Sequence, residues 1–171
     1  NYDAAYQLSL QATEEFGWYN RNTGYNPFTA EGKKSAALEI WETILLEEDL
    51  TNPLCVFVSV GDGNIISGIH KGFKDLSRIG QIEVMPRIFG CQSTGSAAIA
   101  NAFAAGSDHI EAVEADTIAD SISVNLPSDG FRALQAALQT NGAYLAVEDR
   151  QILEALTDLG KAGIFAEPAG S

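Results

Sequence analysis

The stretch Leu54-Cys55-Val56-Phe57-Val58-Ser59-Val60-Gly61-Asp62-Gly63-Asn64 decides the fold of this 171-residue chain. Residues 54–60 are apolar and β-branched without polar alternation, which predicts a strand that is covered on both faces. The glycines and Asn64 that follow predict a tight turn. Apolar residues then recur at helical spacing, and Gly80 stops the pattern; they are Ile65, Ile66, Ile69, Phe73 and Leu76.

Similar patterns continue on both sides of this unit. They predict further helices over residues 3–16, from Glu31 to about 47–49, and over 95–103, 131–138 and 149–160, with strands over 18–20, 87–92, 142–147 and 163–166. Asp3 is the predicted N-cap of the first helix, and Glu148 or Asp149 that of the last. We therefore expect an α/β fold with a mostly parallel sheet flanked by helices.

Two segments do not fit this alternation. Residues 22–27 are rich in turn-forming side chains and mark the best internal boundary. Residues 106–116 are acidic and irregular, and residues 117–122 could begin an element that the sequence alone does not assign.

The net charge of −13 is unevenly distributed, with −6 in residues 1–50, +1 in 51–107 and −8 in 108–171. Such an acidic chain is a poor partner for the nucleic-acid backbone. An anionic ligand would meet the least repulsion in the middle segment, although solvated acidic helices at the flanks explain the distribution equally well. No apolar run approaches the roughly 20 residues of a membrane span and no leader opens the sequence, so we expect no membrane partner and a cytoplasmic location.

Isolated cysteines and histidines offer no competing chemistry. Cys55 and Cys91 lie in apolar runs and are expected to be inert core thiols. His70 is expected to be a packed or surface histidine, and His109 falls in the acidic segment. Because no hydrolase triad order and no metal-binding spacing is present, we assign neither a catalytic residue nor a metal ligand.

The glycine turn predicts a phosphate-binding loop of Gly61, Asp62, Gly63, Asn64 and Ile65. A strand that leads through small residues into a helix directs several main-chain N–H groups at one point, where the helix dipole adds positive charge. Without Cβ atoms, the two glycines would let the backbone turn sharply and approach a ligand closely. Asn64 would cap the helix or donate its amide, and Asp62 would have to face away from the phosphate. A tight turn that binds nothing fits the glycine spacing equally well.

Known nucleotide motifs do not fit this loop. Ile66 stands where the dinucleotide fingerprint requires its third glycine, and Ile69 stands where the nucleotide P-loop requires lysine.

Several segments together resemble threonine synthase, a fold-type II pyridoxal-phosphate enzyme of the tryptophan-synthase-β group. The matching segments cover nearly the whole chain in one order; they are Asn20-Arg21-Asn22, Asn26 to Lys34, Ser59 to Ile65, Lys71 to Asp75, Pro86-Arg87-Ile88, Gln92 with Gly95-Ser96-Ala97, and Ile164 to Ala169. The resemblance implies that Gly61 to Ile65 cradle the phosphate of pyridoxal 5'-phosphate. It further implies conversion of the small-molecule substrate O-phosphohomoserine and water to threonine and phosphate, often in a homodimer.

The same resemblance implies that the chain is an incomplete, inactive part of a two-domain enzyme. Residues 1–23 would end the smaller domain, and residues 24–171 would form the main part of the larger, cofactor-binding domain. The Schiff-base lysine of the family would precede Asn1, and the segment that meets the pyridine nitrogen would follow Ser171. The Phe73-Lys74-Asp75 sequence imitates the Schiff-base motif, but Lys74 is about ten residues into the predicted helix and is expected to be a surface charge paired near Asp75 or Arg78.

Three alternatives remain open. Threonine dehydratase and cysteate synthase share the loop and the Glu167-Pro168-Ala169 segment, and Thr94 stands where relatives often carry glutamate. From another class, the chain could be a non-catalytic module that binds a phosphorylated ligand.

Overall fold

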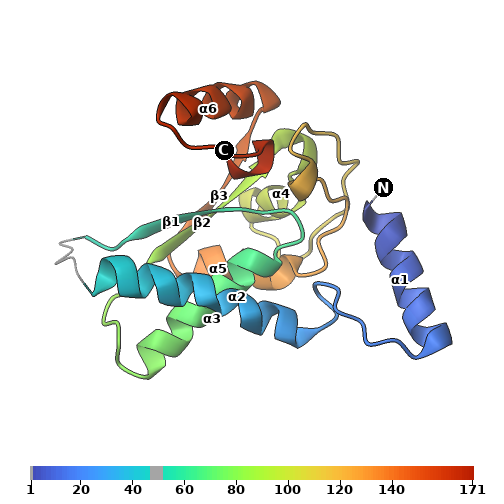
Figure 1. Ribbon diagram of the computed structural model, residues 1–171, viewed down its shortest axis with the longest axis horizontal. Helices are drawn as coiled ribbons and strands as arrows, with labels where there is room; N and C mark the ends of the chain where they lie inside the picture. Colours follow the sequence, from blue (N-terminus) through green and yellow to red (C-terminus); the bar gives the residue numbers. More distant parts are fainter. Residues whose placement is uncertain (1, 47–51) are drawn as a thin grey trace.

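A computed structural model describes residues 2–46 and 52–171, and it contains the expected parallel α/β fold. Three strands pair in the order β1 (Cys55–Ser59), β2 (Arg87–Ser93) and β3 (Ala143–Val147), with Phe57 opposite Phe89 and Phe89 opposite Ala143. The α-helices are α1 (Tyr2–Phe16), α2 (Pro27–Ile40), α3 (Asn64–Arg78), α4 (Ala98–Ala105), α5 (Gly130–Gln139) and α6 (Asp149–Lys161). Figure 1 shows α2, α3 and α5 together on one side of the sheet and α1 apart from the other helices.

The predicted unit around the glycine turn is confirmed as β1 followed by α3. Ile66, Ile69, Phe73 and Leu76 form the buried face of α3. The helix is stopped at Gly80, whose φ of +73° suits glycine, while the next residue donates its N–H to the Leu76 carbonyl at 2.9 Å. Burial of these four apolar side chains fixes how α3, and therefore the loop before it, sits against the sheet.

Within the described residues β1 is covered on only one face, so the prediction of a fully covered β1 is wrong. Val56 and Val58 are buried beneath the helices, whereas Cys55 is exposed and Phe57 is 61% exposed. The ring of Phe57 stacks on that of Phe89 at 4.9 Å between centroids. A strand that is apolar from Cys55 to Val58 therefore leaves every second side chain of that run outside the core.

The expectation of two inert core thiols is corrected by the same geometry. Cys55 is exposed because it lies on the uncovered face of β1. Cys91 is half-buried, and burial raises the pKa of its thiol.

The first residues of α1 and α2 differ from those that the sequence pattern predicted. The first helix already includes Tyr2, so Asp3 lies in its first turn and is not its N-cap. The α2 helix begins at Pro27, four residues before Glu31, because the Asn26 side chain accepts the Phe28 N–H at 3.0 Å. It continues as a π-helical turn over Trp41–Leu45. Its expected end at 47–49 lies outside the described residues.

The strand predicted over residues 18–20 is wrong. Asn20 is buried and forms a local turn, since its Oδ1 accepts the Asn22 N–H at 2.7 Å and its Nδ2 donates to Thr13 Oγ1 at 2.8 Å. These bonds hold the segment in an irregular conformation. The turn over residues 23–25 that follows confirms the turn-rich segment.

The strand predicted over residues 163–166 is also absent from the described structure. The Ile164 N–H donates to the Leu159 carbonyl at 2.9 Å and closes the end of α6, while Phe165 is fully exposed. The apolar residues of this segment follow the end of α6 and are not part of the sheet.

Smaller departures affect the remaining boundaries. The helix expected over 95–103 divides into a 3₁₀ turn at Thr94–Ser96 and α4. The unassigned 117–122 segment contains a 3₁₀ turn at Asp120–Ile122. Glu148 is the N-cap of α6, and its N–H donates to Gln151 Oε1 at 2.9 Å. Among the described residues, no helix combines the length and apolarity that a membrane crossing requires.

Candidate functional site

A cavity of about 940 Å³ opens at the carboxyl end of β1, where the strand passes into α3. In parallel α/β folds, this end of the strands is where ligands bind. All five predicted loop residues line the cavity, together with residues from the N-terminal part of the chain and from the irregular segment before α5; they are Tyr2, Asp3, Thr23, Lys33, Ser59, Ile66, 114–116 and 120–125.

The main-chain N–H groups of residues 61–65 are available to a ligand. None of them has a hydrogen-bond acceptor within residues 2–46 and 52–171, although Gly61, Gly63 and Asn64 are buried. The first internal bond at the start of α3 is donated by Ser67 to the Gly63 carbonyl at 3.2 Å. Buried donors without acceptors at the start of a 15-residue helix form a site that suits an anion such as a phosphate group.

The two loop glycines serve protein packing in addition to the turn. A Cβ on Gly63 would lie 2.7 Å from the Cβ of Ala133, and one on Gly61 would lie 2.8 Å from the Cα of Ile122. Gly63 also has a φ of +89°, in the left-handed region. The missing side chains therefore make room for the neighbouring backbone of this chain as well as for the turn itself.

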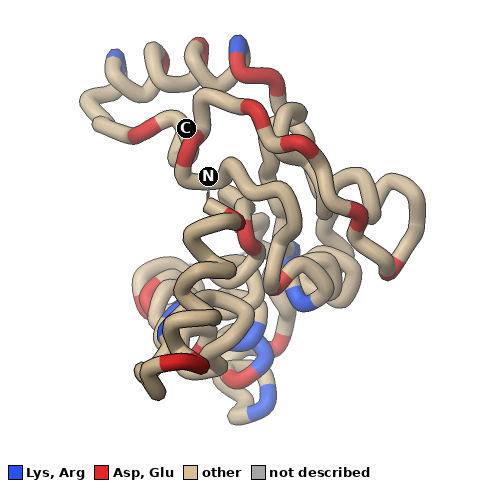
Figure 2. Tube along the Cα trace, turned by 90° about the vertical axis from the view of Figure 1, so that its right-hand side faces the viewer, with Lys and Arg blue, Asp and Glu red and all other residues tan. Residues whose placement is uncertain are grey.

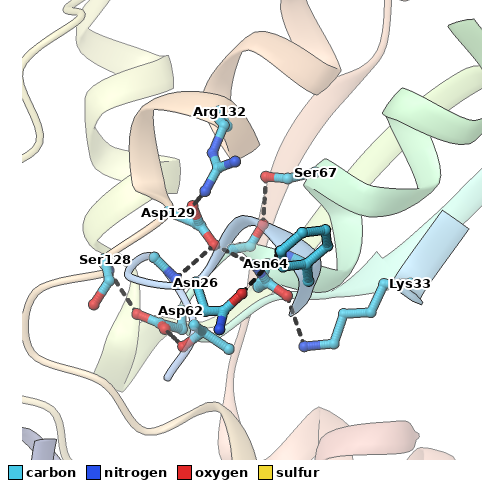
Figure 3. A network of polar contacts seen from close by, with 12 residues as sticks. Asn26, Lys33, Asp62, Asn64, Ser67, Ser128, Asp129 and Arg132 are labelled. Carbon is cyan, nitrogen blue, oxygen red and sulfur yellow. Dashed lines mark hydrogen bonds and ion pairs between the residues drawn. The ribbon is translucent and has the colours of Figure 1, made fainter. Parts of the chain in front are cut away.

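The carboxylate of Asp62 is held by the protein. Its Oδ1 accepts the Ser128 N–H at 2.5 Å (Figure 3). Its Oδ2 accepts hydrogen bonds from the hydroxyl of Thr23 and from that of Tyr2, the latter at 3.3 Å. The Asp62 carbonyl in turn accepts the Asp129 N–H at 3.0 Å. Asp62 thus ties the loop to the segment before α5, and its carboxylate does not occupy the N–H groups of the loop.

Of the two roles expected for Asn64, it does not cap the helix, because the N-cap of α3 is Gly63; its amide does donate to an oxygen, which belongs to a side chain of this protein. Its Oδ1 accepts a hydrogen bond from Lys33 Nζ at 2.8 Å, and its Nδ2 donates to Asp129 (Figure 3). The side chain of Asp129 is 1% exposed and also accepts from Arg132 and from the Gly24 N–H. Charge-assisted bonds in so buried a place fix the loop firmly to α2 and α5.

Lys33 is a site residue that sequence reasoning missed. Burial lowers the pKa of its ammonium group, while the carboxylates of Asp129 and Asp62 act in the opposite direction. The available signal was its position on α2 between the buried Ala30 and Ala37, on the face that packs against Gly68. Lys33 is the only basic residue in the lining of this cavity among the described residues, and its positive charge favours an anion locally, beside Asn64. The same lining also contains five acidic residues, which are Asp3, Asp62, Glu114, Asp116 and Asp120.

Lys74 lies outside this cavity, as the sequence analysis expected. Its Nζ donates to Gln139 Oε1 at 3.3 Å, so the expected pairing near Asp75 or Arg78 is wrong. Asp75 instead accepts from Lys34 at 2.8 Å and from Lys71 at 3.1 Å, and both amines lower the pKa of its carboxyl.

The chain is similar to enzymes named threonine synthase. It is 36% identical to threonine synthase from Methanocaldococcus jannaschii over 173 residues and 31% identical to that from Methanosarcina acetivorans. Each alignment covers the whole chain but 42% of the relative, so the chain spans less than half the length of these relatives.

A solved structure shares the fold at lower sequence similarity. A threonine deaminase from T.th. superposes with a TM-score of 0.74 over 95% of this chain and 55% of its own, at 22% identity. A family model described as pyridoxal-phosphate dependent enzyme matches residues 1–171. The chain therefore belongs to the pyridoxal-phosphate dependent enzymes.

Proposed function

We propose that the N–H groups of Gly61, Asp62, Gly63, Asn64 and Ile65 bind the phosphate group of pyridoxal 5'-phosphate. The observation that carries the proposal is the run of main-chain donors without acceptors at the start of α3, beside the Lys33 ammonium group. Main-chain donors fixed by the Asp62 and Asn64 side chains need little rearrangement to bind the anion. The residues present therefore fit the phosphate of the cofactor.

We further propose threonine synthase as the activity of the protein that contains this chain. The cofactor, when bound, withdraws electrons from the carbon atoms of an amino-acid substrate. The contribution of this chain is to hold the phosphate end and to orient the cofactor in the cavity. The supporting observation is the 36% identity to a threonine synthase over the whole chain.

The proposed division of the enzyme places residues 1–23 at the end of a smaller domain and residues 24–171 in the larger one. Two features support it. The α1 helix contains no buried residue, and it stands apart from the helices that cover the sheet (Figure 1). Tyr2 nevertheless reaches the loop through its bond to Asp62.

Cofactor binding is tested by comparing pyridoxal 5'-phosphate with pyridoxal in calorimetric titrations of the purified protein. Because the loop would recognise only the phosphate, pyridoxal should bind at least about tenfold more weakly. Equal affinities would contradict the proposed role of the loop.

The reaction is tested by incubating the cofactor-loaded full-length protein with O-phosphohomoserine or with threonine. Release of inorganic phosphate from the first supports threonine synthase. Release of ammonia from threonine without phosphate release would replace it by threonine dehydratase, the activity suggested by the fold shared with a threonine deaminase. Cofactor binding with neither reaction would exclude both enzymes and leave the other two alternatives, cysteate synthase and a non-catalytic phospholigand-binding module.

A further inference from the structure

A second cavity, of about 340 Å³, lies between α3 and α5 and shares no lining residue with the first. Residues 67, 70, 71, 74 and 78 line it from one stripe of α3, and residues 131, 132, 135 and 139 line it from α5. Ala30 at the start of α2 completes the wall. Neither the cofactor nor the substrate proposed above accounts for this space.

The lining of this second cavity is basic in an acidic chain. It contains four of the ten Lys and Arg residues and none of the 23 Asp and Glu residues; the four are Lys71, Lys74, Arg78 and Arg132. Figure 2 shows most Lys and Arg gathered in the lower half of the view, away from α6. The electrostatic potential in this cavity is therefore more favourable to an anion than the potential over the rest of the surface.

The basic groups differ in how far the protein already neutralises them. Lys71 pairs with Glu31 at 2.8 Å, and Arg132 pairs with the buried Asp129. Arg78 has one long contact of 3.6 Å to Asp75. Lys74 forms no ion pair within the described residues, and its Nζ donates only to the neutral Gln139 across the groove. Lys74 and Arg78 are thus the cations most available to a ligand.

His70 supplies a hydrogen-bonding group to this cavity. Its side chain is 7% exposed and lines the cavity, yet it has no hydrogen-bond partner among residues 2–46 and 52–171. The ring nitrogens of His70 are not fully enclosed by the protein, so they are accessible from the cavity. In its neutral form, the ring keeps one N–H donor that could bind an anion in the cavity.

We propose that the groove between α3 and α5 is a binding site for a phosphate-type anion, with His70 donating a hydrogen bond and Lys74 and Arg78 supplying the charge. Phe131, which is 57% exposed, offers an apolar wall beside these groups. The ligand is inorganic phosphate or the phosphate monoester of a small molecule, because a cavity of about 340 Å³ accommodates either.

The chain contains only two histidines, so the site can be observed directly. In protein labelled with ¹⁵N-histidine, inorganic phosphate is titrated at neutral pH and constant ionic strength while the ring nitrogens of His70 and His109 are followed by NMR. The His70 signals should shift and saturate. The signals of the exposed His109 should show at most a small linear drift. A second titration with phenyl phosphate separates the two ligand sources: tighter binding identifies a monoester that packs on Phe131, and equal binding identifies free phosphate.

Matched variants decide whether the basic groups are responsible. Lys74→Gln combined with Arg78→Gln should weaken phosphate binding at His70 at least about tenfold. Arg150→Gln combined with Lys161→Gln removes the same charge from exposed positions on α6 and should leave the binding unchanged. Parallel drift of both histidines, or equal affinity in both double variants, would overturn the proposal. Because the readout is at His70, neither result depends on whether the loop binds the cofactor.

Discussion

The candidate site requires a residue without a Cβ atom at position 63. Gly63 combines a left-handed backbone with close packing, since its carbonyl accepts the Ser67 hydroxyl at 2.6 Å and its α-carbon faces Ala133. Two separate physical reasons therefore exclude a side chain there. They can be separated by comparison with Gly80, which has a φ of +73° but no atom within 4 Å of where a Cβ would stand.

Gly63→Ala should destabilise the protein by about 2–4 kcal/mol, from backbone strain and overpacking together. Gly80→Ala should destabilise it by about 1–2 kcal/mol, because only the backbone strain applies. Urea unfolding of both variants measures the difference. Equal decreases in the free energy of unfolding would mean that the structure around Ala133 adjusts to the added methyl group without cost.

His70 predicts a pH dependence of stability. Burial, and secondarily the charge of Lys74, lowers the pKa of its imidazole from 6.5 to about 4. The groups that face it across the groove and on its own helix are Arg132, Lys71 and Lys74. Between pH 6.5 and 4 the unfolded chain takes up a proton that the folded chain does not, so this histidine favours unfolding progressively as the pH falls through that window.

The contribution of His70 is isolated by comparing the native sequence with His70→Gln. The native protein should lose up to about 3 kcal/mol more stability than the variant on acidification through this window. Urea unfolding at several pH values measures both free energies. Parallel pH profiles of the two proteins would show that His70 titrates normally in the folded state.

At the scale of elements, the start of α5 supports the start of α3. The Ser128 and Asp129 N–H groups donate to Asp62, and the Asp129 carboxylate accepts from Asn64. Two consecutive residues, 128 and 129, therefore connect the loop to a helix that lies more than 60 residues later in the chain. The geometry of the loop over residues 61–65 therefore depends on α5 as well as on β1 and α3.

Asp129→Asn should destabilise the protein by about 2–3 kcal/mol. The substitution replaces one carboxylate oxygen, which accepts a hydrogen bond from Asn64 or Arg132, by an NH₂ group that can only donate. Affinity for pyridoxal 5'-phosphate should fall as well. Asp158→Asn is the matched control: Asp158 also forms an i,i+3 pair, with Lys161, but both side chains are over 70% exposed. Asp158→Asn should lower the free energy of unfolding by at most about 0.5 kcal/mol. Similar unfolding energies of the two variants would exclude a special role for Asp129.

At the scale of the whole molecule, the two faces of the sheet are covered unequally by the described residues. Ile88 is fully buried under the helices, whereas Phe57 and Leu145 on the opposite face are 61% and 42% exposed. The relatives named threonine synthase are more than twice as long as this chain. Substitutions on the buried face should therefore lower the free energy of unfolding much more than substitutions on the exposed face.

Ile88→Ala should destabilise the protein by about 2–5 kcal/mol by leaving a cavity in the core. Phe57→Thr combined with Leu145→Thr should cost only about 1–2 kcal/mol for the two substitutions together, since roughly half of each side chain is already in water. Denaturant unfolding compares the two. A large loss from the double variant would mean that this face is covered in solution.

The sequence predicted the elements whose signals are local and periodic. The buried stripe of α3, its stop at Gly80 and the parallel strands are of this kind. It could not tell that Phe57 lies outside the core, because an apolar run is the same whether one face is covered or two. Nor could it pair Asn64 with Asp129 or place Lys33 in the cavity, since those contacts exist only after α2, α3 and α5 have packed together.

The close packing of α2 on α3 has a mechanical consequence. The backbone carbonyl of Ala30 lies 2.8 Å from where a Cβ of Gly68 would stand, and the Cβ of Ala37 lies 2.6 Å from that of Gly72, so no side chain separates the two helices at these points. Such close packing leaves little space for the two helices to slide past each other. We therefore expect that a displacement of Lys33 on α2 also displaces residues 61–65 at the start of α3, to which Lys33 is hydrogen-bonded through Asn64.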